Sequence, residues 1–86
     1  MYQILIKKRA KKFIDKLPST EKRRIVEAIE RLPEGDDIKR LRGYESILRL
    51  RVGSYRIIYE VDNGRLIVTV IDVGNRGQIY KDGVSP

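Results

Sequence analysis

The chain has 86 residues, of which 41% are hydrophobic and 36% charged, and 19 Lys and Arg against 12 Asp and Glu give it a net charge of +7. A chain of this length buries one small core, so residues 1–86 are expected to form a single domain whose basic surface favours polyanionic partners. The absence of Cys and His excludes disulfides, histidine or thiolate catalysis and the usual zinc ligands, so neither a metal nor a cofactor is expected. Because we find no signal peptide and no run of ~20 apolar residues, we expect a cytoplasmic protein that does not enter a membrane.

The first half of the chain predicts a strand and a pair of helices. Tyr2 to Ile6 is rich in β-favouring residues and too short for a helix, so a strand is expected there. Two apolar stripes with helical spacing follow, one formed by Ala10, Phe13, Ile14 and Leu17 and the other by Ile25, Ala28, Ile29 and Leu32. Pro18 separates them, and Ser19 is the expected N-cap of the second helix. Such a short link predicts an antiparallel helical hairpin.

The second half predicts three strands joined by tight turns. Residues 33–37 read as a loop and Ile38 to Gly43 as a basic connector. The strands are expected at Ile47 to Val52, Tyr55 to Val61 and Arg65 to Val73, with turns at Gly53-Ser54 and Asn63-Gly64. The order β-α-α-β-β-β indicates an α+β fold, an antiparallel β-sheet with the N-terminal helical hairpin packed on one face.

Counting outward from the two turns predicts which residues face each other across the strands. The first turn places Arg51 opposite Arg56, and the second places Arg56 opposite Ile71, Ile57 opposite Val70 and Tyr59 opposite Val68. The face toward the helices would then contain Leu48, Leu50, Val52, Ile57, Tyr59, Leu66, Val68 and Val70. The other face would contain Arg49, Arg51, Arg56, Ile58, Ile67 and Ile71.

Basic residues gather in the middle of the sequence. Between Ile38 and Arg56 there are six basic residues and one acidic residue, Glu45. Like charges directly opposite each other destabilise a sheet, so arginines kept there without an obvious carboxylate partner indicate an anion site; a solvated sheet face is the alternative. Arg76 lies in a glycine-flanked turn that would bring it to the same face, and Tyr80 after it is suited either to stacking on a base or to covering apolar sheet surface.

Three stretches of the sequence together resemble the RelE-type toxins of the RelE/ParE superfamily. They are Lys39–Gly43, Leu50–Tyr59 and Asp72–Arg76 with Tyr80 after it. The resemblance implies cleavage of messenger RNA in the ribosomal A site by attack of the RNA's own 2′-hydroxyl, and neutralisation by a cognate antitoxin protein. It also implies that Arg56 stabilises the phosphorane-like transition state, that Arg76 is the second arginine of the site and that Tyr80 stacks on the nucleotide.

Two positions depart from the family pattern. Ile47 and Arg49 stand where some members carry two lysines, and we assign Arg49 to charge stabilisation and substrate positioning. No histidine is present to act as general base, so the proton of the 2′-hydroxyl is expected to pass to solvent, ribosomal RNA or the substrate phosphate. General affinity for RNA and the ribosome is assigned to the remaining basic residues Arg51, Lys39, Arg40, Arg42, Lys7, Lys8, Lys11 and Lys12.

Two other functions fit the same sequence. A ParE-like toxin would share the fold but act by binding DNA gyrase, and a non-catalytic RNA-binding module is favoured by Ile47. The joint presence of Arg56, Arg76 and Tyr80 favours the ribonuclease. Ile58, Ile67 and Ile71 would leave an apolar strip beside basic residues, which predicts an antitoxin helix with apolar and acidic sides unless the C-terminal tail closes the strip.

Overall fold

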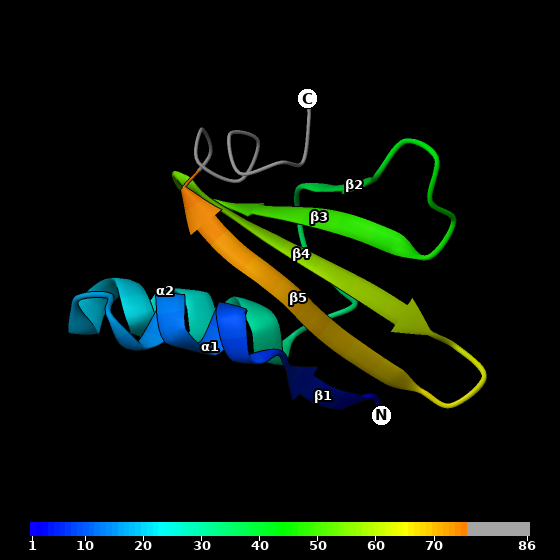
Figure 1. Ribbon diagram of the computed structural model, residues 1–86, viewed down its shortest axis with the longest axis horizontal. Coiled ribbons are helices and arrows are strands. Elements are labelled where there is room, and N and C mark those ends of the chain that lie inside the picture. Colours follow the sequence, from blue (N-terminus) through cyan, green and yellow to red (C-terminus); the bar gives the residue numbers. More distant parts are fainter. Residues whose placement is uncertain (76–86) are drawn as a thin grey trace.

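The computed structural model of the protein describes residues 1–75, which form two helices packed on one face of a five-stranded sheet (Figure 1). In chain order the elements are β1 (Gln3–Ile6), α1 (Lys8–Asp15), α2 (Ser19–Glu30), β2 (Ile38–Arg40), β3 (Ile47–Val52), β4 (Tyr55–Asp62) and β5 (Ile67–Asn75). The α+β class, the helical hairpin on one face and the predicted order of the helices and main strands are confirmed. Neither helix within residues 1–75 is long and apolar enough to span a bilayer.

The helices bury the apolar stripes that the sequence predicts. Ala10 and Ile14 of α1 and Ile25 and Ile29 of α2 are buried against the sheet. Ser19 is not the N-cap of α2, however. Pro18 takes that position in an extended conformation, and its carbonyl oxygen accepts a hydrogen bond from the Lys22 amide at 2.8 Å. The ψ angle of Pro18, 152°, lies outside the helical range, so Ser19 is the first helical residue.

The sheet is mixed, with the strand order β1-β5-β4-β3-β2. The β1 strand pairs in parallel with β5, and α1 and α2 carry the chain from β1 at one edge of the sheet to β2 at the other edge. The segment expected as a basic connector contributes the short edge strand β2, which pairs with β3 so that Lys39 lies opposite Arg49. The antiparallel sheet expected from the sequence is therefore extended by one strand at each edge, one of them parallel.

The β3–β4 hairpin has the predicted register, with Arg51 opposite Arg56 and Val52 opposite Tyr55. Its two-residue turn contains Gly53 at φ +59°, a backbone conformation that side chains with a Cβ rarely adopt. This turn determines how the arginines of the two strands meet.

The predicted register between β4 and β5 is wrong. The turn is a four-residue loop, 63–66, because the Asp62 carboxylate accepts hydrogen bonds from the amides of Gly64 and Arg65, each at 3.1 Å. A bulge then inserts one extra residue between the pairs Tyr59–Val70 and Ile58–Asp72. As a result Arg56 lies opposite Gly74, not Ile71, while Ile57 lies opposite Val73 and Tyr59 opposite Val70.

The core lies between the helices and the sheet. Leu50, Ile57, Tyr59, Val68 and Val70 are buried in it as predicted, with Leu48 and Val52 packed against it. Leu66 was wrongly expected there: it lies in the loop at φ +58° and is 44% exposed. Val73 takes a core position instead, because the bulge changes the register. The hydroxyl group of Tyr59 is buried without a hydrogen-bond partner among the described residues, and burial raises the pKa of this tyrosine.

Candidate functional site

The sheet face away from the helices carries two neighbouring cross-strand pairs of basic residues. Arg51 of β3 lies opposite Arg56 of β4, and Lys39 of β2 lies opposite Arg49 of β3. Arg49 and Arg51 alternate along β3 with Leu48 and Leu50, which face the core, so their side chains lie on the opposite face. The structure therefore brings together four basic residues that the sequence singled out, and Gly74 opposite Arg56 adds no side chain between them.

Two of these arginines have a carboxylate partner, contrary to the expectation from sequence. One oxygen of Asp37 accepts a hydrogen bond from Arg49 Nη1 at 3.3 Å, and the other oxygen lies 3.7 Å from Arg51 Nη1. The Arg49 side chain is only 7% exposed, whereas that of Arg51 is 35% exposed. A buried guanidinium needs such a counter-ion, because its charge loses hydration in the fold. Sequence reasoning therefore missed Asp37. Its contacts with Arg49 and Arg51 require the pairing of β2 with β3.

Arg56 is half-buried at the start of β4, next to a contact that ties this strand to the helices. The adjacent Tyr55 donates a hydrogen bond through its hydroxyl group to a carboxylate oxygen of Glu21 in the first turn of α2. The Tyr55 ring also lies edge-on to Phe13 of α1, with 6.1 Å between ring centroids. The hydrogen bond to Glu21 raises the pKa of Tyr55, with further contributions from burial and from the Glu21 charge. Both helices are thus connected to the strand that carries Arg56.

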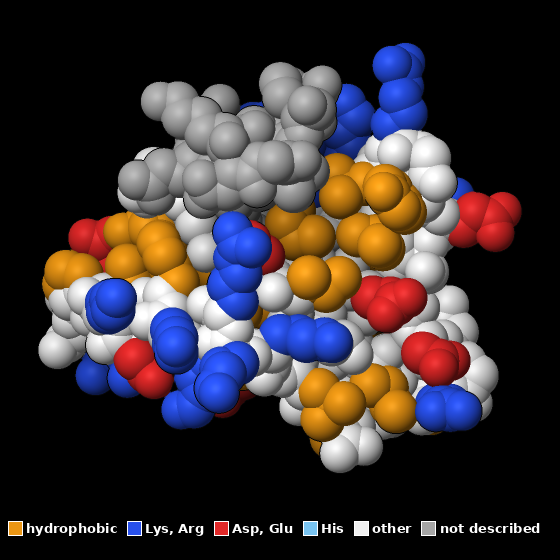
Figure 2. Space-filling model, in the orientation of Figure 1, with side chains coloured by type: hydrophobic (Ala, Val, Ile, Leu, Met, Phe, Trp, Pro, Cys, Tyr) orange, Lys and Arg blue, Asp and Glu red, His pale blue; other side chains and the backbone are white. Residues whose placement is uncertain are grey.

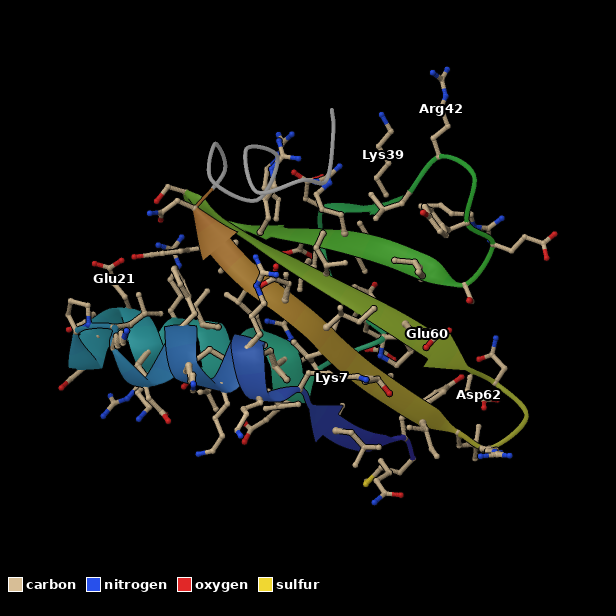
Figure 3. All side chains as sticks on the ribbon, viewed as in Figure 1. Lys7, Glu21, Lys39, Arg42, Glu60 and Asp62 are labelled. Atoms are coloured by element: carbon tan, nitrogen blue, oxygen red, sulfur yellow. The ribbon has the colours of Figure 1, made fainter. Side chains whose placement is uncertain are left out.

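The other predicted site residues lie in different parts of the molecule. Arg76 and Tyr80 lie outside the described residues. Arg42 points away from the sheet in the loop that follows β2 (Figure 3), and Arg40 of β2 is also exposed. Figure 2 shows further basic side chains gathered over the helices. The exposed basic residues in this part of the chain include Lys7, just before α1, and Lys8, Lys11 and Lys12 of α1. Lys8, Lys11 and Lys12 belong to α1, whereas the arginines belong to the strands β3 and β4.

The apolar strip expected beside the arginines is only partly present. Ile67 and Ile71 are half-buried, but Ile58 is buried at 8% exposure, although it lies outside the core cluster beneath the helices. The expectation that Ile58 is uncovered is therefore wrong. Its neighbours across the strands are Arg49 and Asp72, and the Asp72 carboxylate lies 3.4 Å from Arg9 Nε of α1.

A pocket of about 300 Å³ opens between α2 and the β3–β4 turn. Its lining mixes basic residues (Arg24, Arg31, Arg51) with acidic ones (Glu27, Glu34, Asp36), so it presents no dominant charge. No group of three or more His, Cys, Asp or Glu residues within 1–75 is placed to hold a metal ion. The arginine face, formed by Lys39, Arg49, Arg51 and Arg56, has the donor groups that bind a phosphate.

Comparison with known proteins agrees with this architecture. Residues 4–80 match the family described as the ParE toxin of the type II toxin–antitoxin system parDE. The putative toxin RelE1 of Methanocaldococcus jannaschii is 31% identical, over 94% of this chain and 97% of the relative.

Solved structures of toxin–antitoxin proteins have the same fold. The RelE–RelB complex from Pyrococcus horikoshii OT3 matches with a TM-score of 0.75 and 29% identity, over 90% of this chain and 97% of that chain. The RelB–RelE complex from Methanococcus jannaschii matches with a TM-score of 0.74 and 31% identity, over 95% and 99%. The isolated E. coli RelE toxin matches with a TM-score of 0.67 and 28% identity, over 98% and 96%. The chain belongs to the RelE/ParE superfamily of toxins from type II toxin–antitoxin systems, and to its RelE type.

Proposed function

We propose that the protein is a ribosome-dependent endoribonuclease that inhibits translation by cleaving messenger RNA. The observation that supports this most is the pair Arg51 and Arg56, which lie opposite each other on the face of a RelE-type sheet that points away from the helices. Displacement at phosphorus spreads negative charge over the equatorial oxygens, and guanidinium groups held in place stabilise that charge without rearranging. Their planar donor geometry suits a phosphate better than the single ammonium of lysine does.

In this proposal the 2′-hydroxyl of the RNA attacks the adjacent phosphate, and no metal ion takes part. Arg56 stabilises the transition state, and the half-buried setting of its strand strengthens that interaction relative to bulk water. Arg76 neutralises charge on the phosphate and leaving group, Tyr80 stacks on the nucleotide, and Arg49 stabilises charge and positions the substrate. Because the chain has no histidine, the proton leaves to solvent, ribosomal RNA or the substrate phosphate.

We also propose a cognate antitoxin as partner. The related RelE toxins were solved in complex with RelB, which supports a partner of this kind. The half-buried Ile67 and Ile71 and the basic residues of the same face favour an antitoxin segment with apolar and acidic sides. A toxin that acts on translating ribosomes would work in the cytoplasm.

The test is a cleavage assay on translating ribosomes with the ends of the RNA mapped. The proposal predicts new messenger ends within the A-site codon, with the 2′,3′-cyclic or 3′-phosphate that attack by a 2′-hydroxyl leaves. RNA binding to the ribosome without new ends would favour a non-catalytic module.

Gyrase binding is the second candidate, and the match of residues 4–80 to the ParE family favours it. A supercoiling assay with DNA gyrase, run with the same protein preparation, separates the two functions. Loss of supercoiling together with intact messenger RNA would overturn the ribonuclease proposal.

A further inference from the structure

One carboxylate, that of Asp37, lies between two arginines at the edge of the free sheet face. Its two oxygens contact different guanidinium groups, at 3.3 Å from Arg49 Nη1 and 3.7 Å from Arg51 Nη1. The main chain holds it there as well, because the Arg51 amide donates a hydrogen bond to the Asp37 carbonyl oxygen at 3.0 Å. The two arginines are therefore directed at a single anion position, whose place is set by the β2–β3 register.

The anion position is open to solvent and not fully occupied. The Asp37 side chain is 50% exposed, and the buried Nε atom of Arg51 has no hydrogen-bond partner among the described residues. Arg51 also lies directly opposite Arg56, and Asp37 shares its charge between Arg49 and Arg51. Carboxylate and phosphate oxygens accept the same charge-assisted hydrogen bonds from guanidinium groups, but a phosphate offers more oxygens.

We propose that Asp37 occupies a phosphate-binding position of the site, and that an RNA phosphate displaces it when RNA binds. The carboxylate acts as an internal counter-ion that holds Arg49 and Arg51 in place in the free protein and competes with the ligand. The identity of the ligand as RNA rests on the proposed function. The competition itself rests on the two contacts of Asp37 and on its exposure.

The experiment compares Asp37→Asn with Asp36→Asn. Both variants remove one negative charge from adjacent positions, but Asp36 forms no ion pair among the described residues. Binding is measured by fluorescence anisotropy over a range of salt concentrations, with a labelled single-stranded oligonucleotide of mixed sequence. Its sugars are 2′-O-methylated, so that no cleavage can occur. Thermal unfolding of each variant is recorded alongside.

Asp37→Asn is expected to bind the oligonucleotide on the order of fivefold more tightly than Asp36→Asn at low salt, the factor that one unit charge at contact distance produces in water. Asp37→Glu should bind like the parent, because it keeps the charge. Equal affinities for the two asparagine variants, weaker binding by Asp37→Asn, or no binding by any of the proteins would overturn the proposal. An Asp37→Ser variant replaces Asp37→Asn if the latter unfolds.

Failure of this inference can be told apart from failure of the proposed function. The oligonucleotide assay measures phosphate binding only, whereas cleavage is measured on translating ribosomes with unmodified messenger RNA. If the parent protein cleaves messenger RNA but both asparagine variants bind the oligonucleotide equally well, only the role of Asp37 is refuted. If the parent protein does not cleave messenger RNA but Asp37→Asn binds the oligonucleotide more tightly, only the ribonuclease proposal is refuted.

Discussion

Replacing Tyr59 with Phe removes a buried hydroxyl group and keeps the ring that fills the core. Tyr59 is fully buried, and its hydroxyl group has no hydrogen-bond partner among the described residues. Leaving a buried polar group without a partner costs about 1–3 kcal/mol, and the loss of one oxygen atom from the packed core offsets part of the gain. We therefore expect Tyr59→Phe to raise the free energy of unfolding by about 1 kcal/mol. For a domain of this size that corresponds to a rise of roughly 4–8 °C in the unfolding midpoint.

The assay is urea unfolding followed by circular dichroism, with Tyr55→Phe as the matched control. The Tyr55 hydroxyl group donates to Glu21, so the same substitution should lower stability there. Opposite signs for the two tyrosines are the expected result, and the comparison matters because most substitutions destabilise a protein. If Tyr59→Phe lowers the free energy of unfolding by more than about 0.5 kcal/mol, the buried hydroxyl group has a partner and the reasoning fails.

The remaining predictions concern pH, salt and the arginine site. The pKa of Tyr55 is raised above its ordinary value of 10.0, so the stability from its bond to Glu21 is present below about pH 10 and is lost as the pH rises through the raised value. The parent should therefore lose more stability than Tyr55→Phe in an alkaline unfolding series, and parallel curves would contradict this. Replacing the exposed lysines of the helix layer in pairs should flatten the salt dependence of ribosome binding and leave the single-turnover cleavage rate unchanged. A large loss of that rate with unchanged ribosome binding would instead assign these lysines to the active site. The pairs are Lys7 with Lys8 and Lys11 with Lys12. Arg49→Lys should keep cleavage activity, and the parent rate should rise with pH through the neutral range. A plateau set by a group titrating near neutrality would reveal a general base that this mechanism lacks.

The arrangement of the sheet was predictable where a turn alone determines it. The two-residue turn at Gly53 and Ser54 leaves one way to pair β3 with β4, so the opposition of Arg51 and Arg56 followed from counting. The same counting failed at β5, because the Asp62 carboxylate lengthens the loop and the extra residue of the bulge changes the register. Neither the longer loop nor the bulge can be predicted from the spacing of the hydrophobic residues. The exchange of Leu66 for Val73 in the core is the direct consequence.

The site was predictable in its arginines and not in its acidic partner. Arg49 and Arg51 share a face because alternate residues of a strand do, and Arg56 shares it because it lies directly opposite Arg51. The contact with Asp37 requires the pairing of β2 with β3, and a three-residue basic strand has too little pattern to predict its partner. The parallel pairing of β1 with β5 is similarly a property of the assembled fold, since local periodicity does not specify which strands become neighbours.

The most direct test of the ribonuclease proposal is the cleavage rate of Arg56→Ala on programmed ribosomes, measured beside Arg65→Ala. Arg65 lies in the exposed loop beyond the far end of β4, so the control removes an equal charge at a distance from the arginine face. We expect Arg56→Ala to cleave about a hundredfold to a thousandfold more slowly than the parent, because it removes one donor to the transition state. Arg65→Ala should stay close to the parental rate, and both variants should unfold at the parental midpoint. A near-parental rate for Arg56→Ala, or a loss of activity that only accompanies unfolding, would contradict the proposed role of the arginine face.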